Sequence, residues 1–129
     1  MAEAWSLAVR VYWEDTDAGG IVYHAAYLQF MERARTEWLR ARGVDQVELR
    51  ASARVQFAVV DMQIDWLRPA RFDDLLTVTA TLAKSGGASG TFRQEVRRLN
   101  EVLVQATVRV AALDADTLKP CRLPAAFVE

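Results

Sequence analysis

Apolar and polar positions alternate along most of this chain, but in one stretch they follow a helical repeat. Between residues 25 and 42, apolar side chains recur every three or four positions, so they line one face of a helix. That face consists of Tyr27, Phe30, Met31, Ala34, Trp38 and Leu39. Gly43 follows the stretch and is a natural helix stop. The pattern therefore predicts one long helix over 25–42.

A period of two, typical of β-strands, runs through much of the remaining chain. It predicts five strands, over residues 6–13, 55–67, 75–83, 91–99 and 102–113. In the second of these the alternation slips between Val59 and Val60, which predicts a β-bulge. Residues 44–54 leave two readings open, a loop or a short second helix that Asp45 caps, with Glu48 three residues later.

The predicted strands are joined by short connections, so neighbouring strands must run antiparallel. Turns are expected at 68–74, 85–90 and 100–101, and a last turn of helix at 125–128. The long helix must bury its apolar face against such a sheet. We therefore expect a single domain over 1–129 of α+β class, with one long helix and an antiparallel sheet of about five strands. No second long helix covers the other face of the sheet, which favours dimerisation.

Composition narrows the class of function. The chain has 129 residues, of which 16 are basic and 17 acidic, and this balance disfavours a nucleic-acid binder driven by bulk charge. Cys121 is the only cysteine, which excludes an intramolecular disulfide and fits a reducing compartment. The sequence shows no signal peptide, and no apolar run approaches the roughly 20 residues of a membrane span. We expect a soluble cytoplasmic protein.

The stretch before the long helix holds the candidate chemistry. It joins Glu14, Asp15 and Asp17 to two adjacent glycines and to the only histidine, His24. Backbone N–H groups at a helix start have no partner inside the helix, and the helix dipole adds positive charge there, so a developing oxyanion can be held. A carboxylate just upstream can act as a base or a nucleophile. This stretch is the candidate active site.

Each of these residues also has a plainer reading. Asp17 can be a loop cap, a lone histidine such as His24 is more often structural than catalytic, and Tyr23 is as readily packed as polar. Paired glycines usually mark a turn, although Gly20 can also let the loop approach a substrate closely. Three carboxylates and a histidine suggest a metal site as well, but they lack a familiar ligand spacing.

The stretch from Val11 to His24, VYWEDTDAGGIVYH, resembles the signature of the 4-hydroxybenzoyl-CoA thioesterase-like branch of hotdog-fold proteins. The likeness continues through residues 27–35, RPAR at 68–71 and Lys119-Pro120, and it covers essentially the whole chain. Within this branch the chain is most similar to the acyl-CoA thioesterases associated with the Tol-Pal system.

The resemblance implies a hotdog fold and hydrolysis of acyl-CoA thioesters by a homodimer or homotetramer, without a metal or organic cofactor. It implies that Asp17 is the catalytic carboxylate. It also implies that the backbone N–H at His24, at the helix start, polarises the thioester carbonyl. The sequence His24-Ala25-Ala26 differs from that of relatives acting on aromatic thioesters, which favours a short- or medium-chain acyl group.

Further substrate contacts are expected around the site. Gly20 and Tyr23 are predicted to support it, and the phosphates of coenzyme A call for cations. Lys84 and Ser85 are predicted to bind substrate, with the glycine-rich turn 85–90 touching the pantetheine arm. Other cations considered for the phosphates are Arg54, Arg68, Arg71, Arg93, Arg97 and Arg98.

Two other functions stay open at this point. One is a non-catalytic hotdog subunit that binds acyl thioesters or an acyl-carrier protein, and it would keep the fold without turnover. The other is a hotdog hydratase or dehydratase, whose acid–base pair is expected closer in sequence than Asp17 and His24. The carrier of the acyl group also stays open between coenzyme A and an acyl-carrier protein.

Overall fold

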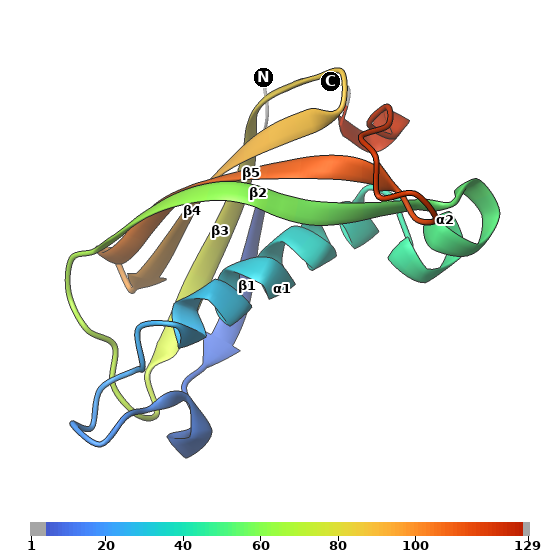
Figure 1. Cartoon of the computed structure of the whole chain (residues 1–129). Coiled ribbons are helices and arrows are strands. Elements are labelled where there is room, and N and C mark those ends of the chain that lie inside the picture. Colours follow the sequence, from blue (N-terminus) through green and yellow to red (C-terminus); the bar gives the residue numbers. More distant parts are fainter. Residues whose placement is uncertain (1–4, 128–129) are drawn as a thin grey trace.

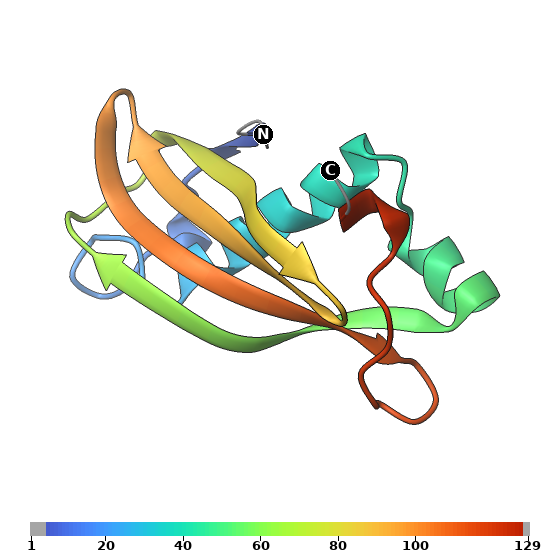
Figure 2. The same cartoon turned by 90° about the horizontal axis from the view of Figure 1, so that it is seen from above.

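The computed structural model describes residues 5–127. Its elements are β1 (Trp5–Arg10), the 3₁₀ turn η1 (Trp13–Asp15), α1 (Ala26–Ala41), α2 (Gln46–Ala53), β2 (Val55–Trp66), β3 (Leu75–Gly86), β4 (Ser89–Arg98), β5 (Glu101–Asp114) and η2 (Ala125–Phe127). The strands form one antiparallel sheet in the order β1-β3-β4-β5-β2, and this sheet curves around α1 (Figure 1, Figure 2). The predicted α+β arrangement is confirmed. Neither helix within residues 5–127 is long and apolar enough to cross a membrane.

The apolar face of α1 lies against β1, β3 and β4. All six side chains of the predicted face are buried. They meet a sheet whose inward side chains alternate as the sequence pattern predicts, which on β3 are Leu76, Val78, Ala80 and Leu82. Removal of these apolar surfaces from water holds the helix on the sheet.

A polar pair is also buried between α1 and the sheet. Arg35 donates through Nη1 to Oε1 of Gln94 on β4 (2.9 Å), and the amide nitrogen of Gln94 donates to the carbonyls of Met31 (3.0 Å) and Thr79 (3.1 Å). Arg35 keeps 8% of its accessible surface and Gln94 keeps 1%. Burial lowers the pKa of Arg35, and the charge of Glu32 partly opposes this effect. Because an unpaired buried polar group is costly, the pair fixes α1 in one position on the sheet.

The open choice for residues 44–54 is resolved in favour of a helix. Asp45 caps α2, since its carboxylate accepts hydrogen bonds from two backbone N–H groups of the first turn (2.9 and 3.3 Å). The predicted bulge in β2 is present as a register shift against β5 between Val59 and Asp61.

Two predicted boundaries are wrong. The first strand ends at Arg10, because the chain then bends into η1 and Trp13 leaves the sheet. The turn predicted over 85–90 is shorter, because β3 and β4 extend into it. Gly87 has a φ of +62°, and a positive φ permits such a tight hairpin. The last helical turn is present as η2, whereas Val128 lies outside the described residues.

The two edges of the sheet differ in length and character. β1 has six residues and β2 has twelve. Three apolar side chains of β2, those of Val59, Val60 and Trp66, are exposed, as is Leu67 just after it. Proteins generally cover or pair a long edge strand of this kind, because its free backbone groups otherwise attract other strands.

Candidate active site

The stretch between β1 and α1 contains a small hairpin. Thr16 and Val22 form an antiparallel bridge, the N–H of Asp17 donates to the carbonyl of Ile21 (2.9 Å), and the N–H of Gly20 donates back to the carbonyl of Asp17 (3.0 Å). Gly20 has a φ of +83°, which side-chain-bearing residues rarely adopt. The hairpin therefore depends on this glycine, and it fixes the backbone of Asp17.

The Asp17 side chain is exposed, and the hairpin uses only one of its carboxylate oxygens. Oδ1 accepts a hydrogen bond from the N–H of Gly19 (2.8 Å). Within residues 5–127, no donor pairs with Oδ2. The local backbone thus orients the carboxylate, as Asp does in turns, and leaves one oxygen available for chemistry.

The helix start next to the hairpin carries unpaired backbone donors. The N–H groups of His24 and Ala25 have no acceptor within the described residues, whereas the N–H of Ala26 donates to the carbonyl of Tyr23 (2.8 Å). Ala25 is the N-cap and has no side-chain oxygen, and the first turn of α1 contains no acidic residue. The positive end of the helix dipole is therefore neither capped nor neutralised by a side chain, which suits the binding of a developing negative charge.

His24 is held in place from the far end of β2. The indole N–H of Trp66 donates to the carbonyl of His24 (3.1 Å), and the two rings meet edge to face with 5.9 Å between centroids. The ring of Tyr23 lies tilted against the imidazole at 4.5 Å. Both His24 and Tyr23 are exposed. Sequence reasoning missed Trp66, because no local pattern indicates a contact between residues 42 positions apart.

The hairpin is also attached to the segment that follows β2. Ile21 and Arg71 form an antiparallel bridge, and the N–H of Val22 donates to the carbonyl of Ala70 (2.9 Å). The N–H of Ala70 in turn donates to the hydroxyl of Tyr27 (3.0 Å), which connects the segment to α1. Burial raises the pKa of Tyr27, so this hydroxyl stays protonated near neutral pH. Hairpin, segment and helix start therefore form one connected unit.

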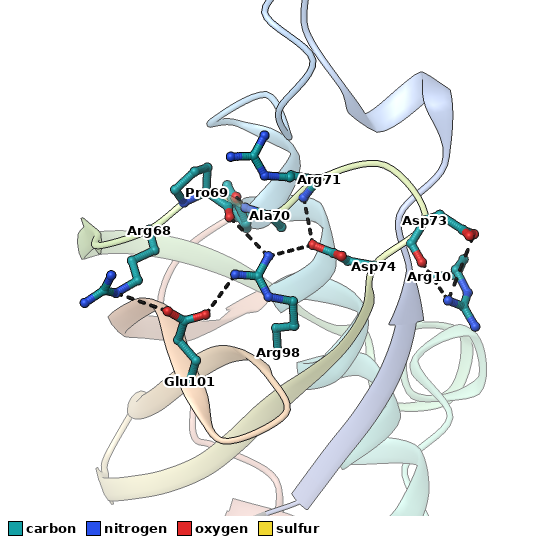
Figure 3. A network of polar contacts seen from close by, with 10 residues as sticks. Arg10, Arg68, Pro69, Ala70, Arg71, Asp73, Asp74, Arg98 and Glu101 are labelled. Atoms are coloured by element: carbon teal, nitrogen blue, oxygen red, sulfur yellow. Dashed lines mark hydrogen bonds and ion pairs between the residues drawn. The ribbon is translucent and has the colours of Figure 1, made fainter.

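Arg98 organises the segment (Figure 3). Its guanidinium donates to Asp74 (2.8 Å) and to Glu101 (2.8 Å), and the N–H of Arg71 donates to the same carboxylate of Asp74 (2.9 Å). Glu101 pairs with Arg68 as well (3.2 Å). Burial by itself raises the pKa of Asp74, but the hydrogen bonds from Arg71 and Arg98 outweigh it, and the pKa lies below its usual range. The RPAR motif thus supports the hairpin structurally.

The structure divides the predicted phosphate-binding cations into two groups. Four of them form ion pairs: Arg54 with Asp116, Arg97 with Glu95, Arg68 with Glu101, and Arg98 with Asp74 and Glu101. Within residues 5–127, Lys84, Arg71 and Arg93 form none. The guanidinium of Arg71 points away from the network around Arg98 and belongs to the segment that pairs with the hairpin (Figure 3). Lys84 and Arg93 border a surface hollow on the sheet.

Not all predicted substrate contacts come together within one protomer. Gly20 and Tyr23 lie in the hairpin and at the helix start. Lys84 and Ser85 lie near the far end of β3, nine and ten residues beyond Leu75, which corresponds to about 30 to 33 Å of extended strand. Lys84 and Ser85 therefore lie toward the end of β3 that is away from the hairpin.

The acidic residues around Asp17 do not converge on a cation site. The carboxylate of Asp15 accepts the backbone N–H of Tyr12 (2.9 Å) inside its own turn. Within residues 5–127, no three His, Cys, Asp or Glu side chains are grouped so that they can hold a metal ion.

Comparison with known proteins identifies relatives along nearly the whole chain. The family model described as the thioesterase superfamily matches residues 19–105. The acyl-CoA thioesterase YbgC of Haemophilus influenzae is 45% identical over 120 residues, which are 93% of this chain and 88% of that protein. The acyl-CoA thioester hydrolase YbgC of Escherichia coli is 46% identical over 121 residues, 93% of this chain and 90% of the relative.

A solved structure gives the same result for the fold. The crystal structure of a "probable thioesterase" from Bartonella henselae is 37% identical to this chain and superimposes with a TM-score of 0.91. The match covers 95% of this chain and 100% of the other. The hotdog fold implied by the sequence resemblance is confirmed.

Proposed function

This chain belongs to the thioesterase superfamily, and we propose that it hydrolyses acyl-CoA thioesters at the hairpin and the adjoining helix start. The observation that carries the proposal is the combination of the unpaired Oδ2 of Asp17 with the unpaired N–H groups of His24 and Ala25 in one connected unit. In this proposal, thioester hydrolysis needs a carboxylate that either attacks the carbonyl carbon or activates a water molecule. It also needs hydrogen-bond donors that stabilise the oxyanion. The hairpin supplies the carboxylate and the helix start supplies the donors, and the proposed reaction uses no cofactor.

In the proposed reaction, the thioester carbonyl accepts a hydrogen bond from the backbone N–H of His24, and the positive end of α1 stabilises the charge that develops on its oxygen. Asp17 acts in one of two ways. It attacks the carbonyl carbon and expels the thiolate of coenzyme A, and water then hydrolyses the mixed anhydride. Alternatively, it takes a proton from the water that attacks. Both routes yield the free acid and coenzyme A, and both restore the Asp17 carboxylate.

Side chains around this centre are assigned supporting roles. The imidazole of His24 orients Asp17 or donates to the thioester, and Tyr23 flanks the bound acyl group. Gly20 lets the substrate approach the backbone of the hairpin closely. Arg71 binds a phosphate of coenzyme A, because its guanidinium lies beside the hairpin without an ion pair of its own among the described residues.

We also propose that the enzyme assembles through the edge of β2, as a homodimer or as a homotetramer of such dimers. The exposed apolar side chains of Val59 and Val60 on this strand support pairing with the same strand of a second copy. In this assembly Lys84 and Ser85 of the second copy contact the coenzyme A portion of the substrate bound at the first.

The proposed substrates carry short- or medium-chain acyl groups, and an acyl-carrier protein is the alternative carrier of the same thioester. A cytoplasmic location is proposed on the free thiol of Cys121, which fits a reducing compartment. An association with the Tol-Pal system stays a prediction from the sequence resemblance.

Thiol release from a panel of acyl-CoAs tests the proposed function. The panel runs from acetyl-CoA to palmitoyl-CoA and includes benzoyl-CoA and 4-hydroxybenzoyl-CoA. We expect release by the wild type and a loss on the order of 10³-fold or more in Asp17→Asn, because the amide can neither attack nor accept the proton. His24→Ala is expected to lose less, since it keeps its backbone N–H.

Circular dichroism and gel filtration serve as controls, and both should match the wild type. Wild-type rates in Asp17→Asn, after deamidation has been checked, would exclude Asp17 as the reacting group. Binding of acyl-CoA by the wild type without any release would instead favour the non-catalytic binding subunit.

A further inference from the structure

A cavity opens beside α1, away from the proposed reaction centre. α1 and β2 run in opposite directions (Figure 1). At one end Trp66, the last residue of β2, contacts His24. Further along, the cavity, of about 240 Å³, opens between the middle of α1, from Glu32 onward, and the first half of β2, around Phe57. The cavity and the helix start thus lie along the same side of α1.

The cavity combines apolar walls, a buried cation and the polar side chains of Glu32, Thr36 and Gln46. Its apolar lining includes Leu39, Phe57, Phe92, Val110 and Phe127. Arg35 also lines it, although this side chain is more than nine-tenths buried. Nη1 of Arg35 is bound to Gln94, whereas Nε and Nη2 have no partner within residues 5–127. Among the described residues no fully buried side-chain nitrogen lacks a partner, so these two donors are accessible from the cavity.

The charge of Arg35 has no direct partner in the described part of the chain. Glu32 lies close enough to act on its pKa, but no ion pair joins the two side chains, and the carboxylate of Glu32 accepts the hydroxyl of Thr36 instead. Burying a guanidinium without a carboxylate is costly, and an anionic ligand removes that cost. Apolar walls beside unpaired guanidinium donors therefore match a hydrocarbon chain that ends in an anionic group, and the carboxylate of Glu32, which also lines the cavity, opposes part of that attraction.

We propose that this cavity receives the far end of the acyl group, and that Arg35 selects thioesters whose acyl chain ends in a carboxylate. The substrate class is then the mono-CoA thioesters of dicarboxylic acids. This inference rests on the proposed function, because it takes the thioester carbonyl to lie at His24. Glu32 is six residues beyond Ala26, about 9 Å along the helix axis, and the acyl chain must span that distance. A methyl terminus would leave the guanidinium unpaired and shielded from water.

The test compares acyl groups of equal carbon number that differ only at the far end. Suberoyl-CoA, sebacoyl-CoA and dodecanedioyl-CoA are each paired with the methyl-ended thioester of the same length. The enzymes are the wild type, Arg35→Gln and a matched control, Arg33→Gln, which removes the same charge from an exposed residue of α1 outside the cavity lining. We expect the wild type to have a higher kcat/KM for the carboxylate-ended member of at least one pair.

For that pair, the preference should fall by about tenfold in Arg35→Gln, as expected for the loss of a charged hydrogen bond, and should stay unchanged in Arg33→Gln. A wild-type preference for the methyl-ended member at every length would overturn the inference. So would a carboxylate preference that survives Arg35→Gln.

Calorimetry decides the question if Arg35→Gln does not fold. Binding of the same pairs to Asp17→Asn should be tighter for the carboxylate-ended thioester, and equal or weaker binding at every length would refute the role of Arg35. Failure of the proposed function has a different outcome, namely no thiol release by the wild type from any thioester. In that case calorimetry on the wild type still tests Arg35.

Discussion

Two glycine-containing turns of this chain share a backbone feature and differ in their surroundings. The hairpin at 17–20 and the turn at 85–90 each contain adjacent glycines. In each, one glycine has a positive φ, +83° at Gly20 and +62° at Gly87. The glycines therefore explain why the chain can turn at both places, but they do not distinguish a site of chemistry from a structural connection.

The difference lies in the polar groups that remain after folding. In the 85–90 turn, the carbonyl of Gly87 accepts the N–H of Leu123 (3.0 Å), and the hydroxyl of Ser85 donates to the carbonyl of Phe127 (2.6 Å). The C-terminal segment thus uses these polar groups of the turn as hydrogen-bond partners. In the hairpin, a carboxylate oxygen and the neighbouring helix start stay unpaired within the described residues. Unused donors and acceptors on a rigid support are what a reaction centre requires.

The largest contrast is expected between Gly20→Ala and Gly87→Ala. Each substitution puts a Cβ at a positive φ where no atom lies within 4 Å, so each should lower the free energy of unfolding by about 1 kcal/mol. Gly20→Ala should also displace Asp17 and reduce kcat/KM by roughly 10- to 100-fold, whereas Gly87→Ala should leave it nearly unchanged. Steady-state kinetics and thermal melting measure both effects. Equal activity losses would mean that the two turns matter equally for catalysis.

The helix and the strands were predictable because they depend on short-range patterns, whereas the roles of Asp17 and His24 stay predictions. The long helix and the antiparallel strands follow from residues that are neighbours in sequence, whereas the sequence predicted only a loop where the structure has the hairpin at 16–22. Burial of Arg35 was not predictable, because it depends on Gln94, which is 59 positions away. The contact of Trp66 with His24 is similarly long-range. Both depend on how far β2 and β4 extend beside α1.

The position of Lys84 relative to the hairpin was likewise not predictable from the sequence. Its neighbourhood in sequence, a glycine-rich turn, favours a role in binding, but sequence alone does not tell at which end of the sheet that turn lies. The structure puts the residue far along β3 from the hairpin. Its proposed contact with substrate is accordingly assigned to a second copy of the chain.

Lys84→Ala provides the second test of the comparison. Loss of one exposed contact with a phosphate of coenzyme A should raise KM by up to about fivefold and leave kcat unchanged. The effect should shrink at high salt. Lys119→Ala is a suitable control, because it removes the other lysine of the chain, which is also exposed. An unchanged KM in Lys84→Ala would exclude the proposed contact of Lys84 with coenzyme A.

A smaller effect, on stability rather than chemistry, should separate the two turns at low pH. The segment that holds the hairpin depends on ionised Asp74, whereas the 85–90 turn is held by neutral hydrogen bonds. The folded-state pKa of Asp74 lies below the unfolded value of 3.8. Its contribution to stability is therefore fully present above that pH and is lost as the pH falls through the folded-state pKa. As the pH falls through the folded-state pKa of Asp74, its protonation should therefore weaken the support of the hairpin but not that of the 85–90 turn.

Asp74→Asn should remove that contribution at neutral pH, about 1 to 2 kcal/mol of unfolding free energy, and the deficit should narrow below pH 4. Urea unfolding from pH 7 to pH 3 measures it, with the exposed neighbour Asp73→Asn as control. Amide exchange locates the effect: the N–H of Val22, bound to Ala70, should exchange faster in Asp74→Asn, and that of Leu123 should not. Equal acceleration at both amides would show that Asp74 stabilises the whole sheet, and the hairpin would then share its support with the structural turn.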